Sequence, residues 1–404
     1  MKIGLYIEHG VGNGVGGAEL LMAYLASVWS RNHDVDLIHH RPTLTLERLA
    51  LFSTDNYERV HVRCVPREEE PASSANLFRR YRDARAWHAS ISAPYDLFLN
   101  CTHWLPSFCH ARTGALLVLF PFYVRPPDMP EMADLPAWKR LRHRAYYDFE
   151  WNRRLATYRH RFAISEYAQT WTRRRWGIDT SVIYPPVDVD LANGPKDNLV
   201  LSVGRFSTAA HTKKQLEMMR TFRELAHTAA GGWTYECVGG LNERDQNRAY
   251  FERVRELADG ASAHVRANLE RTEVTRLFSR ARIFWHATGL DDDTDSHPEL
   301  AEHFGIATVE AMAAGAVPVV INKGGQPEIV QHGVNGFVWN TLDELKNYTQ
   351  QLAEDPALRS RMSAAARVRA QDFSRERFVE RMSAACGVAS RRGPIAREPA
   401  IVNG

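Results

Sequence analysis

Short runs of consecutive apolar residues recur along the chain and alternate with longer segments whose apolar positions repeat every three to four residues. Such runs predict buried strands, and the longer segments predict helices that pack on them. In the first half we expect strands at residues 2–8, 33–40, 95–100, 115–120 and 161–165. In the second half we expect them at residues 198–204, 234–239, 264–269, 283–287 and 317–321. This alternation predicts an α/β protein with parallel sheets.

A break in the pattern divides the chain. Residues 180–188 contain Pro185 and Pro186, which can continue neither a helix nor a central strand, and residues 192–197 add a polar loop. We therefore place a domain boundary near 184–196. The first domain is expected over 1–185 and the second over 186–374, with helices at 342–354, 357–371 and 375–386 and a flexible tail over 391–404.

The segment 297–340 contains the highest concentration of candidate functional residues. Gly305 precedes a run of good helix formers, Gly315 ends it, and a buried strand follows at 317–321. Glu302 and Glu310 stand eight positions apart around the helix start. Within one helix that spacing would separate them by roughly 12 Å and turn them to different faces. We therefore expect Glu302 in the preceding loop and Glu310 one turn inside the helix.

This arrangement leaves the exposed amides of the first helical turn, from Gly305 to Thr308, between the two carboxylates. A helix N-terminus with a glycine at close approach suits a phosphate group. The sequence thus indicates a site for a diphosphate flanked by polyol groups. Taken alone, the two glutamates fit a solvated surface helix equally well.

Basic residues follow the first strand of the second domain. Arg205 comes directly after that strand, and Lys213 and Lys214 stand at the start of the next helix. All three can point to the carboxyl edge of a parallel sheet, where α/β proteins hold ligands. Cations at this edge would neutralise a diphosphate.

Three neighbouring strings resemble the carboxyl-terminal half of the GT4 family. They are Glu-Ala-Met-Ala-Ala-Gly at 310–315, Val-Pro-Val-Val at 317–320 and Gly-Gly-x-x-Glu-Ile-Val at 324–330. The Glu302 and Glu310 spacing belongs to the same resemblance. GT4 enzymes are retaining glycosyltransferases that use nucleotide sugars and have the GT-B fold. The resemblance implies two Rossmann-like domains facing a cleft, with the C-terminal helix of 375–390 crossing back onto the first domain.

The resemblance also implies roles for particular residues. Arg205 and Lys213, with Lys214 as a substitute, would bind the diphosphate of the donor. Glu302 would hold the transferred sugar, and Glu310 the ribose hydroxyls. The donor-binding backbone would lie at Gly305, Ile306, Ala307 and Thr308, and the base would be read near Val265 and Arg266. GT-B enzymes generally need no metal, so no cofactor is expected beside the nucleotide sugar.

A glycine-rich loop follows the first strand. Gly12, Gly14 and Gly17 fit the dinucleotide-binding pattern Gly-x-Gly-x-x-Gly. That pattern also needs an acidic residue near the end of the second strand, and residues 38–40 read Ile-His-His. In GT4 enzymes the corresponding loop closes over donor phosphates or acceptor, and this role is carried onto Gly16 and Gly17. A plain tight turn is the alternative.

One part of the chain departs from the family. Many GT4 members carry a histidine that lines the sugar site after the strand expected at 115–120, but residues 120–123 read Phe-Pro-Phe-Tyr. Either His103 from the neighbouring loop replaces it as a catalytic residue, or the acceptor pocket is built differently.

Residues 126–162 combine aromatic and basic side chains in one or two predicted helices. Trp138, Leu141, Ala145, Phe149 and Arg153 fall at helical spacing and form an apolar stripe. The stripe could dock to a membrane or an acceptor, or it could pack on the sheet with the arginines outside. We favour packing on the sheet. Nucleic acid is not indicated, because no binding motif accompanies the arginines.

The loop at 290–297 is rich in aspartate and suggests an Asp-x-Asp metal site. That motif belongs to the other large glycosyltransferase fold, so we interpret the loop as solvated and expect no metal ligands.

The composition indicates the cellular compartment in which the protein is expected. Five scattered cysteines lack zinc spacing, and no apolar run approaches the roughly 20 residues that span a bilayer. We expect a cytoplasmic protein whose membrane contact is peripheral. Residues 1–185 carry 24 Lys and Arg against 19 Asp and Glu, an excess of five, although the whole chain has a net charge of only +3. A basic first domain suits a membrane surface or a phosphorylated acceptor.

These observations predict a metal-independent retaining hexosyltransferase that acts on a carbohydrate or lipid-linked acceptor in polysaccharide, glycolipid or glycoconjugate synthesis. A nucleotide-sugar 2-epimerase of the same fold and a non-catalytic sugar-nucleotide-binding protein stay open as alternatives. A nicotinamide-dependent dehydrogenase would need the missing acidic residue. Uridine, guanosine and thymidine donors are all compatible with the sequence.

Overall fold

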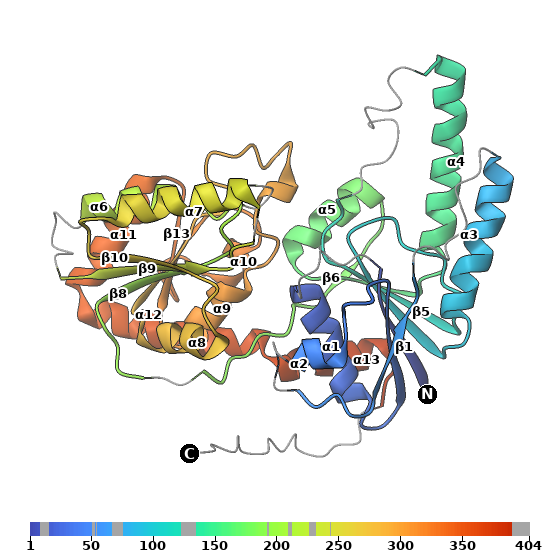
Figure 1. Ribbon diagram of the computed structural model, residues 1–404, viewed down its shortest axis with the longest axis horizontal. Helices are drawn as coiled ribbons and strands as arrows, with labels where there is room; N and C mark the ends of the chain where they lie inside the picture. The colour runs from blue at the N-terminus through green and yellow to red at the C-terminus, as the bar shows by residue number, and fades with distance from the viewer. Residues whose placement is uncertain are drawn as a thin grey trace.

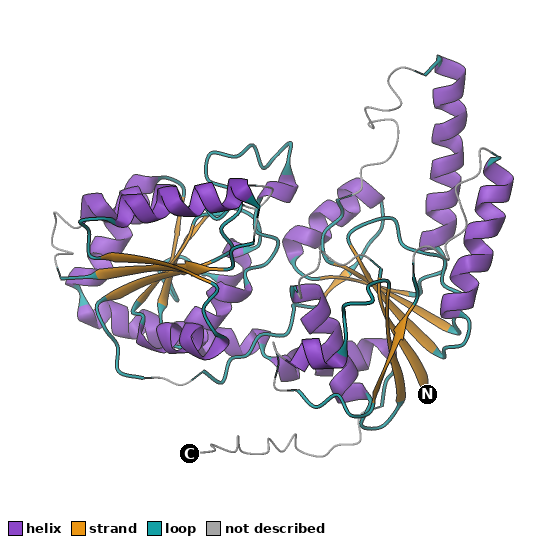
Figure 2. Cartoon of the chain, in the orientation of Figure 1, coloured by secondary structure: helices purple, strands orange, loops and turns teal. Residues whose placement is uncertain are grey.

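The computed structural model has two lobes, each built around a parallel sheet with helices on both faces (Figures 1 and 2). It describes residues 1–8, 16–50, 53, 55–66, 76–122, 135–191, 194–208, 212–225, 232–242 and 244–389. Of the features singled out in the sequence, Gly12, Gly14, residues 126–134 and the tail at 391–404 lie outside these ranges.

The first lobe contains seven parallel strands in the order β3-β2-β1-β4-β5-β6-β7. The strands are β1 Lys2–Ile7, β2 Asp34–His39, β3 Val60–Cys64, β4 Leu97–Thr102, β5 Thr113–Val118, β6 His160–Ala163 and β7 Ser181–Val182. The helices are α1 Gly17–Trp29, α2 Leu46–Ala50, α3 Leu77–Ser92, α4 Ala137–Leu155 and α5 Glu166–Trp176.

The second lobe repeats this topology with six parallel strands in the order β10-β9-β8-β11-β12-β13. The strands are β8 Leu199–Val203, β9 Thr234–Gly239, β10 Ala263–Ala267, β11 Ile283–His286, β12 Val317–Ile321 and β13 Phe337–Trp339. The helices of this lobe are α6 Gln215–Leu225, α7 Asp245–Ala258, α8 Arg271–Arg280, α9 Ile306–Ala313, α10 Gln326–Ile329, α11 Leu342–Glu354 and α12 Pro356–Ala370, with 3₁₀ turns at Pro298–Leu300 and Gln371–Phe373. The last helix, α13 Arg375–Cys386, follows them in the chain.

The strand order places the ligand-binding edges. Strands β4 and β12 are buried along their whole length, as expected for central strands covered by helices on both faces. In each sheet the order reverses between the first and fourth strands, β1 and β4 in one and β8 and β11 in the other. The crevice beside the carboxyl ends of such strands is where α/β sheets bind ligands. The predicted α/β class with two Rossmann-like GT-B domains is therefore confirmed.

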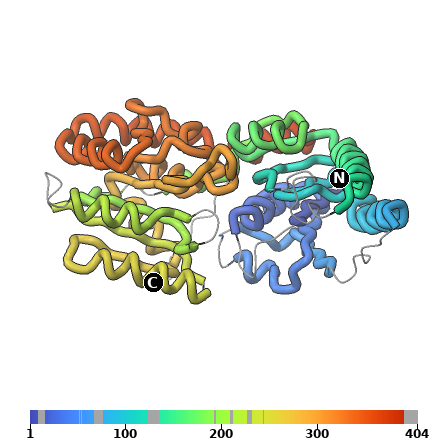
Figure 3. The backbone as a smooth tube through the Cα atoms, turned by 90° about the horizontal axis from the view of Figure 1, so that it is seen from above, coloured from blue at the N-terminus to red at the C-terminus, as the bar shows by residue number. Residues whose placement is uncertain are grey.

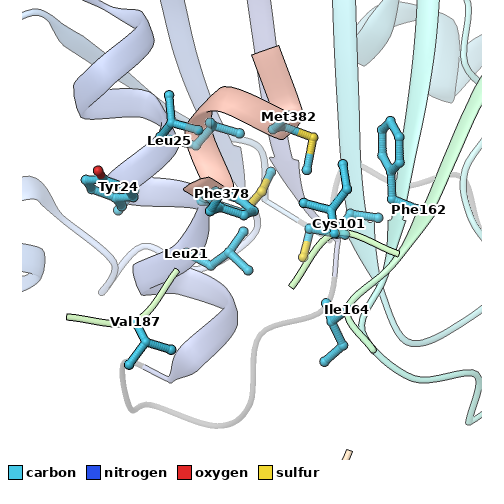
Figure 4. Packing of buried hydrophobic residues seen from close by; sticks show 14 of the residues in the cluster. Leu21, Tyr24, Leu25, Cys101, Phe162, Ile164, Val187, Phe378 and Met382 are labelled. Carbon is cyan, nitrogen blue, oxygen red and sulfur yellow. The ribbon is translucent and has the colours of Figure 1, made fainter. Parts of the chain in front are cut away.

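The last helix belongs to the core of the first lobe. Phe378 and Met382 of α13 lie in one buried cluster with Leu21 and Leu25 of α1 (Figure 4). The indole Nε1 of Trp29 donates to Ser383 Oγ at 2.9 Å. Seen from above, the red end of the chain returns to the lobe that contains the N-terminus (Figure 3). The predicted crossover helix is thus present.

The chain crosses between the lobes twice, and the two crossings lie side by side. The amide of Val187 donates to Phe373 O at 3.1 Å, and Val187 pairs with Ser374 in an isolated parallel bridge. Val187 is buried in the cluster that holds α13. This bridge therefore joins the segment that leaves the first lobe, at Val187, to the segment that returns to it, at Ser374.

Helix α4 corrects one expectation. The stripe of Trp138, Leu141 and Phe149 does not pack on the sheet: these residues are 60%, 69% and 47% exposed. Trp151 and Leu155, near the other end of the helix, are buried instead. The outer part of α4 projects beyond the rest of the lobe (Figure 1).

A buried histidine predicts how stability depends on pH. His39, at the end of β2, is 2% exposed, and burial together with Arg41 lowers its pKa to about 4. The backbone amide of Arg41 donates to His39 Nδ1 at 3.2 Å, so a second proton at Nδ1 would face that donor. The unfolded chain binds a proton near pH 6.5, whereas the folded chain does not until about pH 4. Stability should therefore fall by about 3 kcal/mol as pH drops through this interval.

Urea unfolding between pH 7 and pH 4.5 tests this expectation. The variant His39→Asn keeps an acceptor near Nδ1 and removes the titration, so its stability should decline less steeply with acid. The exposed His61 provides a control, since His61→Asn should follow the parent. Parallel decline in all three proteins would contradict the assignment.

Candidate functional site

Two catalytic candidates from separate loops meet at the carboxyl edge of the second sheet. Lys213, on the segment between β8 and α6, forms an ion pair with Glu302 through its ammonium group. His286, the last residue of β11, lies beside them with Nε2 3.2 Å from Glu302 Oε2. The sheet thus gathers an ammonium, a carboxylate and an imidazole at the point where its strand order reverses.

The charges of this group are fixed by their neighbours. Burial opposes ionisation of Glu302, but the Lys213 ammonium and the His286 ring outweigh it and hold the pKa of Glu302 well below its usual value. Burial lowers the pKa of His286, so its ring is neutral. Because an ionised carboxylate only accepts hydrogen bonds, His286 Nε2 carries the proton that it donates to Glu302. Glu302 is thus a fixed anion at neutral pH.

Close packing of glycines shapes the backbone around this group. A side chain at Gly204, next to β8, would come 2.6 Å from Lys213 Cγ, so only a glycine lets the lysine pass. Gly324 has a φ of +64°, and a Cβ there would overlap the carbonyl oxygen of Glu302. The amide of Gly325 donates to the same oxygen at 2.8 Å. The Gly-Gly pair of the motif therefore holds the backbone of the catalytic glutamate.

Helix α9 starts directly after this loop, and Glu302 and Glu310 lie in the loop and one turn inside the helix, as their spacing predicts. Gly305 caps the helix with a φ of +127°, and Ile306 is 38% exposed. The predicted donor-binding turn is only partly available. The amide of Thr308 donates to Gly305 O at 3.1 Å, and its hydroxyl donates to Gln326 Oε1 at 2.8 Å. This leaves Ile306 and Ala307 as the first-turn amides for a ligand.

Glu310 is 7% exposed and forms an ion pair with Arg271 at the start of α8. Burial raises the pKa of Glu310, and Arg271 opposes that shift. A ribose that hydrogen-bonds to Glu310 would share this carboxylate with Arg271. Nothing in the sequence singled out Arg271, because its partner lies 39 positions away.

Lys214 faces the aspartate-rich loop rather than Glu302. Its ammonium binds Asp292 Oδ1 at 2.8 Å, and Lys323 donates to Asp292 O at 2.8 Å. The loop is therefore tied to the site by two lysines and is not simply solvated. Among the described residues no group of three or more His, Cys, Asp or Glu side chains could hold a metal ion.

Three further donor-side candidates lie on the same sheet or directly after one of its strands. Arg205 is exposed on the loop after β8, and its carbonyl accepts from Gln215 Nε2 at 3.1 Å. Val265 is a paired residue of β10 and packs against the core of the lobe. Arg266 is engaged by two carboxylates, Glu236 at 3.0 Å and Glu273 at 3.1 Å. Contact between Arg266 and a base would compete with these ion pairs.

The start of α1, at Gly16 and Gly17, lies close to the start of α9. A Cβ at Gly17 would lie 3.7 Å from Ile306 Cδ1, which places α1 next to the donor-binding turn. The amide of Gly16 donates to Glu19 Oε2 at 2.9 Å, and Glu19 pairs with Arg41. Gly16 thus begins α1 in a capping arrangement, and Gly17 faces the second domain.

His103 lies in an aromatic group at the carboxyl edge of the first sheet. Its ring is 4.8 Å from that of Phe122, and Trp104 is 6.0 Å from the same ring. A different histidine from the second domain completes this group: the ring of His303 stacks on Phe120 at 3.8 Å and 3°. His303 therefore brings an imidazole of the second domain against Phe120, in the segment 120–123 where the sequence departs from the family pattern. Sequence reasoning missed it because the two rings are distant in the chain, although His303 directly follows Glu302.

Further contacts join the two domains beside this stack. Ser165 Oγ donates to His303 O at 2.6 Å, and Tyr167 donates its hydroxyl to Pro298 O at 2.9 Å. Arg175 pairs with Glu299 at 2.8 Å. The loop that carries Glu302 is thus held between its own sheet and helix α5 of the first domain.

Comparisons with known proteins concern the same part of the chain. Residues 188–369 match the family model described as glycosyl transferases group 1. The match covers somewhat less than half of the chain, and it likens the second lobe to GT4-type glycosyltransferases. The candidate site at Glu302 and Lys213 lies within the matched segment.

Two curated relatives each match about half of this chain. A Dictyostelium discoideum protein named GDP-Man:Man(3)GlcNAc(2)-PP-Dol alpha-1,2-mannosyltransferase is 29% identical over 240 residues, which are 52% of this chain and 44% of the relative. The human alpha-1,3/1,6-mannosyltransferase ALG2 is 24% identical over 233 residues, 51% of each chain. The chain spans about half the length of the curated relatives it matches.

Solved structures share the fold along nearly the whole of this chain. A glycosyltransferase from Rickettsia africae superposes with a TM-score of 0.65 at 15% identity and covers 96% of this chain and 99% of its own. Anabaena Alr3699/HepE in complex with UDP superposes with a TM-score of 0.65 at 18% identity, covering 96% of this chain and 100% of that chain. Both likenesses concern the fold alone.

Proposed function

We propose that this protein is a retaining glycosyltransferase that moves a hexose from a nucleoside diphosphate sugar to an acceptor hydroxyl. The observation that carries the proposal is the Lys213 and Glu302 pair beside the N-terminus of α9. It unites a cation for a diphosphate with an anion for sugar hydroxyls at the ligand-binding edge of the sheet.

The proposed chemistry rests on stabilising the leaving group. Breaking the anomeric C–O bond loads negative charge onto the diphosphate. Lys213, Arg205 and the amides of Ile306 and Ala307 would meet that charge, and groups already fixed in place need no reorganisation at the transition state. Retention would follow from attack on the same face, with the leaving phosphate taking the acceptor proton. We propose that these side chains supply the positive charge without a metal.

Glu302 would position the sugar itself. Its carboxylate is kept ionised by Lys213 and His286, so it can accept hydrogen bonds from sugar hydroxyls. The base would be read near Val265, and Glu310 would receive the ribose. The first domain would bring the acceptor, with His103 from that domain and His303 from the second domain lying where the two domains meet.

Mannose is the first donor sugar to test, because the relatives with the matches described above are named as mannosyltransferases. We further propose a lipid-linked carbohydrate acceptor and peripheral contact with a membrane. No helix within the described parts of the chain has the length and apolar character that crossing a bilayer requires. These relatives are named as transferases, which favours a transferase over an epimerase.

A thermal-shift panel with GDP, UDP, dTDP and NAD in the presence of EDTA tests the donor site. One nucleoside diphosphate should raise the melting temperature, since ligand at 100 times its Kd stabilises the folded state by about 2.7 kcal/mol. GDP is expected to give the largest rise.

Lys213→Met should abolish that rise, whereas Lys346→Met, a lysine paired on the outer helix α11, should retain it. A response to NAD alone, or equal responses in both variants, would overturn the assignment of the site.

A further inference from the structure

Helices α3 and α4 form a projecting pair, which we call the α3–α4 ridge (Leu77–Ser92 and Ala137–Leu155). The two helices stand at the outer side of the first lobe, and α4 reaches furthest from it (Figure 1). Arg80 of α3 holds them together, with its guanidinium 5.5 Å from the ring of Tyr147. Since Trp151 and Leu155 anchor the inner end of α4, its first turns are the part that projects.

The ridge exposes large apolar side chains. Phe78 is 75% exposed, Leu141 69%, Trp138 60% and Phe149 47%, and they are four of the nine large exposed apolar residues in the described chain. Trp138, Leu141 and Phe149 share one face of α4, because Trp138 and Phe149 lie eleven positions, about three full turns, apart and Leu141 lies three positions after Trp138. Such an exposed stripe on a folded domain marks an interaction surface.

The same two helices carry a strong excess of positive charge. They contain ten arginines and lysines against three carboxylates, a net charge of +7, whereas the whole chain has a net charge of +3. The rest of the protein is therefore net negative, at −4. Lys139 and Arg142 lie over the ring of Trp138 at 5.4 and 5.8 Å, and Arg153 lies over Phe149 at 5.3 Å. Cations thus flank both exposed aromatic rings of α4.

We propose that the α3–α4 ridge docks the protein on an anionic lipid surface. Aromatic and aliphatic side chains on one helix face enter the headgroup region, while surrounding arginines and lysines attract acidic headgroups. A second copy of the chain would bring +7 against +7, which disfavours self-association through this face. A nucleic acid would use the charge and the aromatic rings but leave Leu141 without an apolar partner.

The biological reason for docking rests on the proposed function, because an enzyme with a lipid-linked acceptor would work at a membrane. The docking surface itself is argued without it. The ridge belongs to the acceptor-side domain, whereas Glu302 and Lys213 belong to the other. Docking would therefore hold the acceptor domain at the surface and leave the donor domain joined to it through the linker and α13.

Flotation of the full chain with lipid vesicles tests the ridge without donor or acceptor. The probes are vesicles of phosphatidylcholine alone, vesicles of equal parts phosphatidylcholine and phosphatidylglycerol, and a single-stranded RNA oligonucleotide. The protein should float with the anionic vesicles only, and added salt should weaken binding. Trp138→Ser with Leu141→Ser, and Arg140→Glu with Arg142→Glu, should each lower the apparent affinity at least about tenfold.

A matched pair on α12 of the other domain, Val368→Ser with Arg361→Glu, also removes an exposed apolar residue and an exposed arginine. It should bind the anionic vesicles like the parent. All variants should keep the parent's thermal shift with nucleoside diphosphate, which separates loss of docking from misfolding. Equal binding to neutral vesicles, tighter binding to RNA, or equal loss in the α12 control would overturn the proposal. A docking failure leaves the transferase assignment intact, and a protein that docks without binding nucleotide would refute only that assignment.

Discussion

Glu302→Gln is expected to lower kcat for sugar transfer by about 10³-fold while the protein stays folded. The amide keeps the shape of the side chain but removes the anion that Lys213 and His286 hold in place. A fixed group aimed at the reacting sugar typically contributes a factor of 10² to 10³ to catalysis. The rate of nucleoside diphosphate release from the donor, with and without acceptor, measures the effect.

The paired cation allows a sharper version of this experiment. Lys213→Met should also lower kcat, but the double variant should lose less than the product of the two single losses, because the residues contact each other. Glu354→Gln, on an exposed end of α11, serves as the control and should keep parental kcat. Fully multiplicative losses would show that the pair does not act as a unit, and parental activity in Glu302→Gln would remove Glu302 from the site.

Gly324→Ala is expected to have the second-largest effect, on both stability and activity. Its φ of +64° costs a side chain about 1 to 2 kcal/mol, and the new Cβ would also overlap the backbone of Glu302. Either the loop moves away from Lys213 or the strain lowers the free energy of unfolding by several kcal/mol. Urea unfolding and kcat together measure how the cost divides between these outcomes.

Gly333→Ala isolates the contribution of the overlap. Gly333 has a similar φ of +77°, but a Cβ there would meet nothing within 4 Å. This variant should lose only the conformational cost of about 1 kcal/mol and keep its activity. Equal losses in the two variants would mean that the backbone of Glu302 does not depend on Gly324.

The sequence predicted the elements that have a strong local signature. The strand at 317–321 and helix α9 were expected because a continuous apolar run and a glycine-bounded helix leave little choice. Helix α3 was not expected, since only His88, Ile91 and Ser92 among its 16 residues are buried. An edge strand such as β3, with a mixed burial pattern, gives a similarly weak signal.

What the sequence could not predict is which distant residues meet. Periodicity showed that α4 has an apolar face but not what covers it, and the structure leaves that face exposed. The stack of Phe120 on His303 and the ion pair of Arg271 with Glu310 depend on how the loops and domains are placed. The motif located Glu302 and Lys213 in the chain, and only the folded sheet joins them.

The return of α13 to the first lobe has a practical consequence for dividing this protein. A fragment of residues 1–185 would lack Phe378 and Met382 and would expose the surfaces of α1 that they cover. Swapping acceptor specificity between relatives by exchanging the amino-terminal half alone would therefore leave a mismatched core. A working chimera should take its final helix from the same parent as its amino-terminal half.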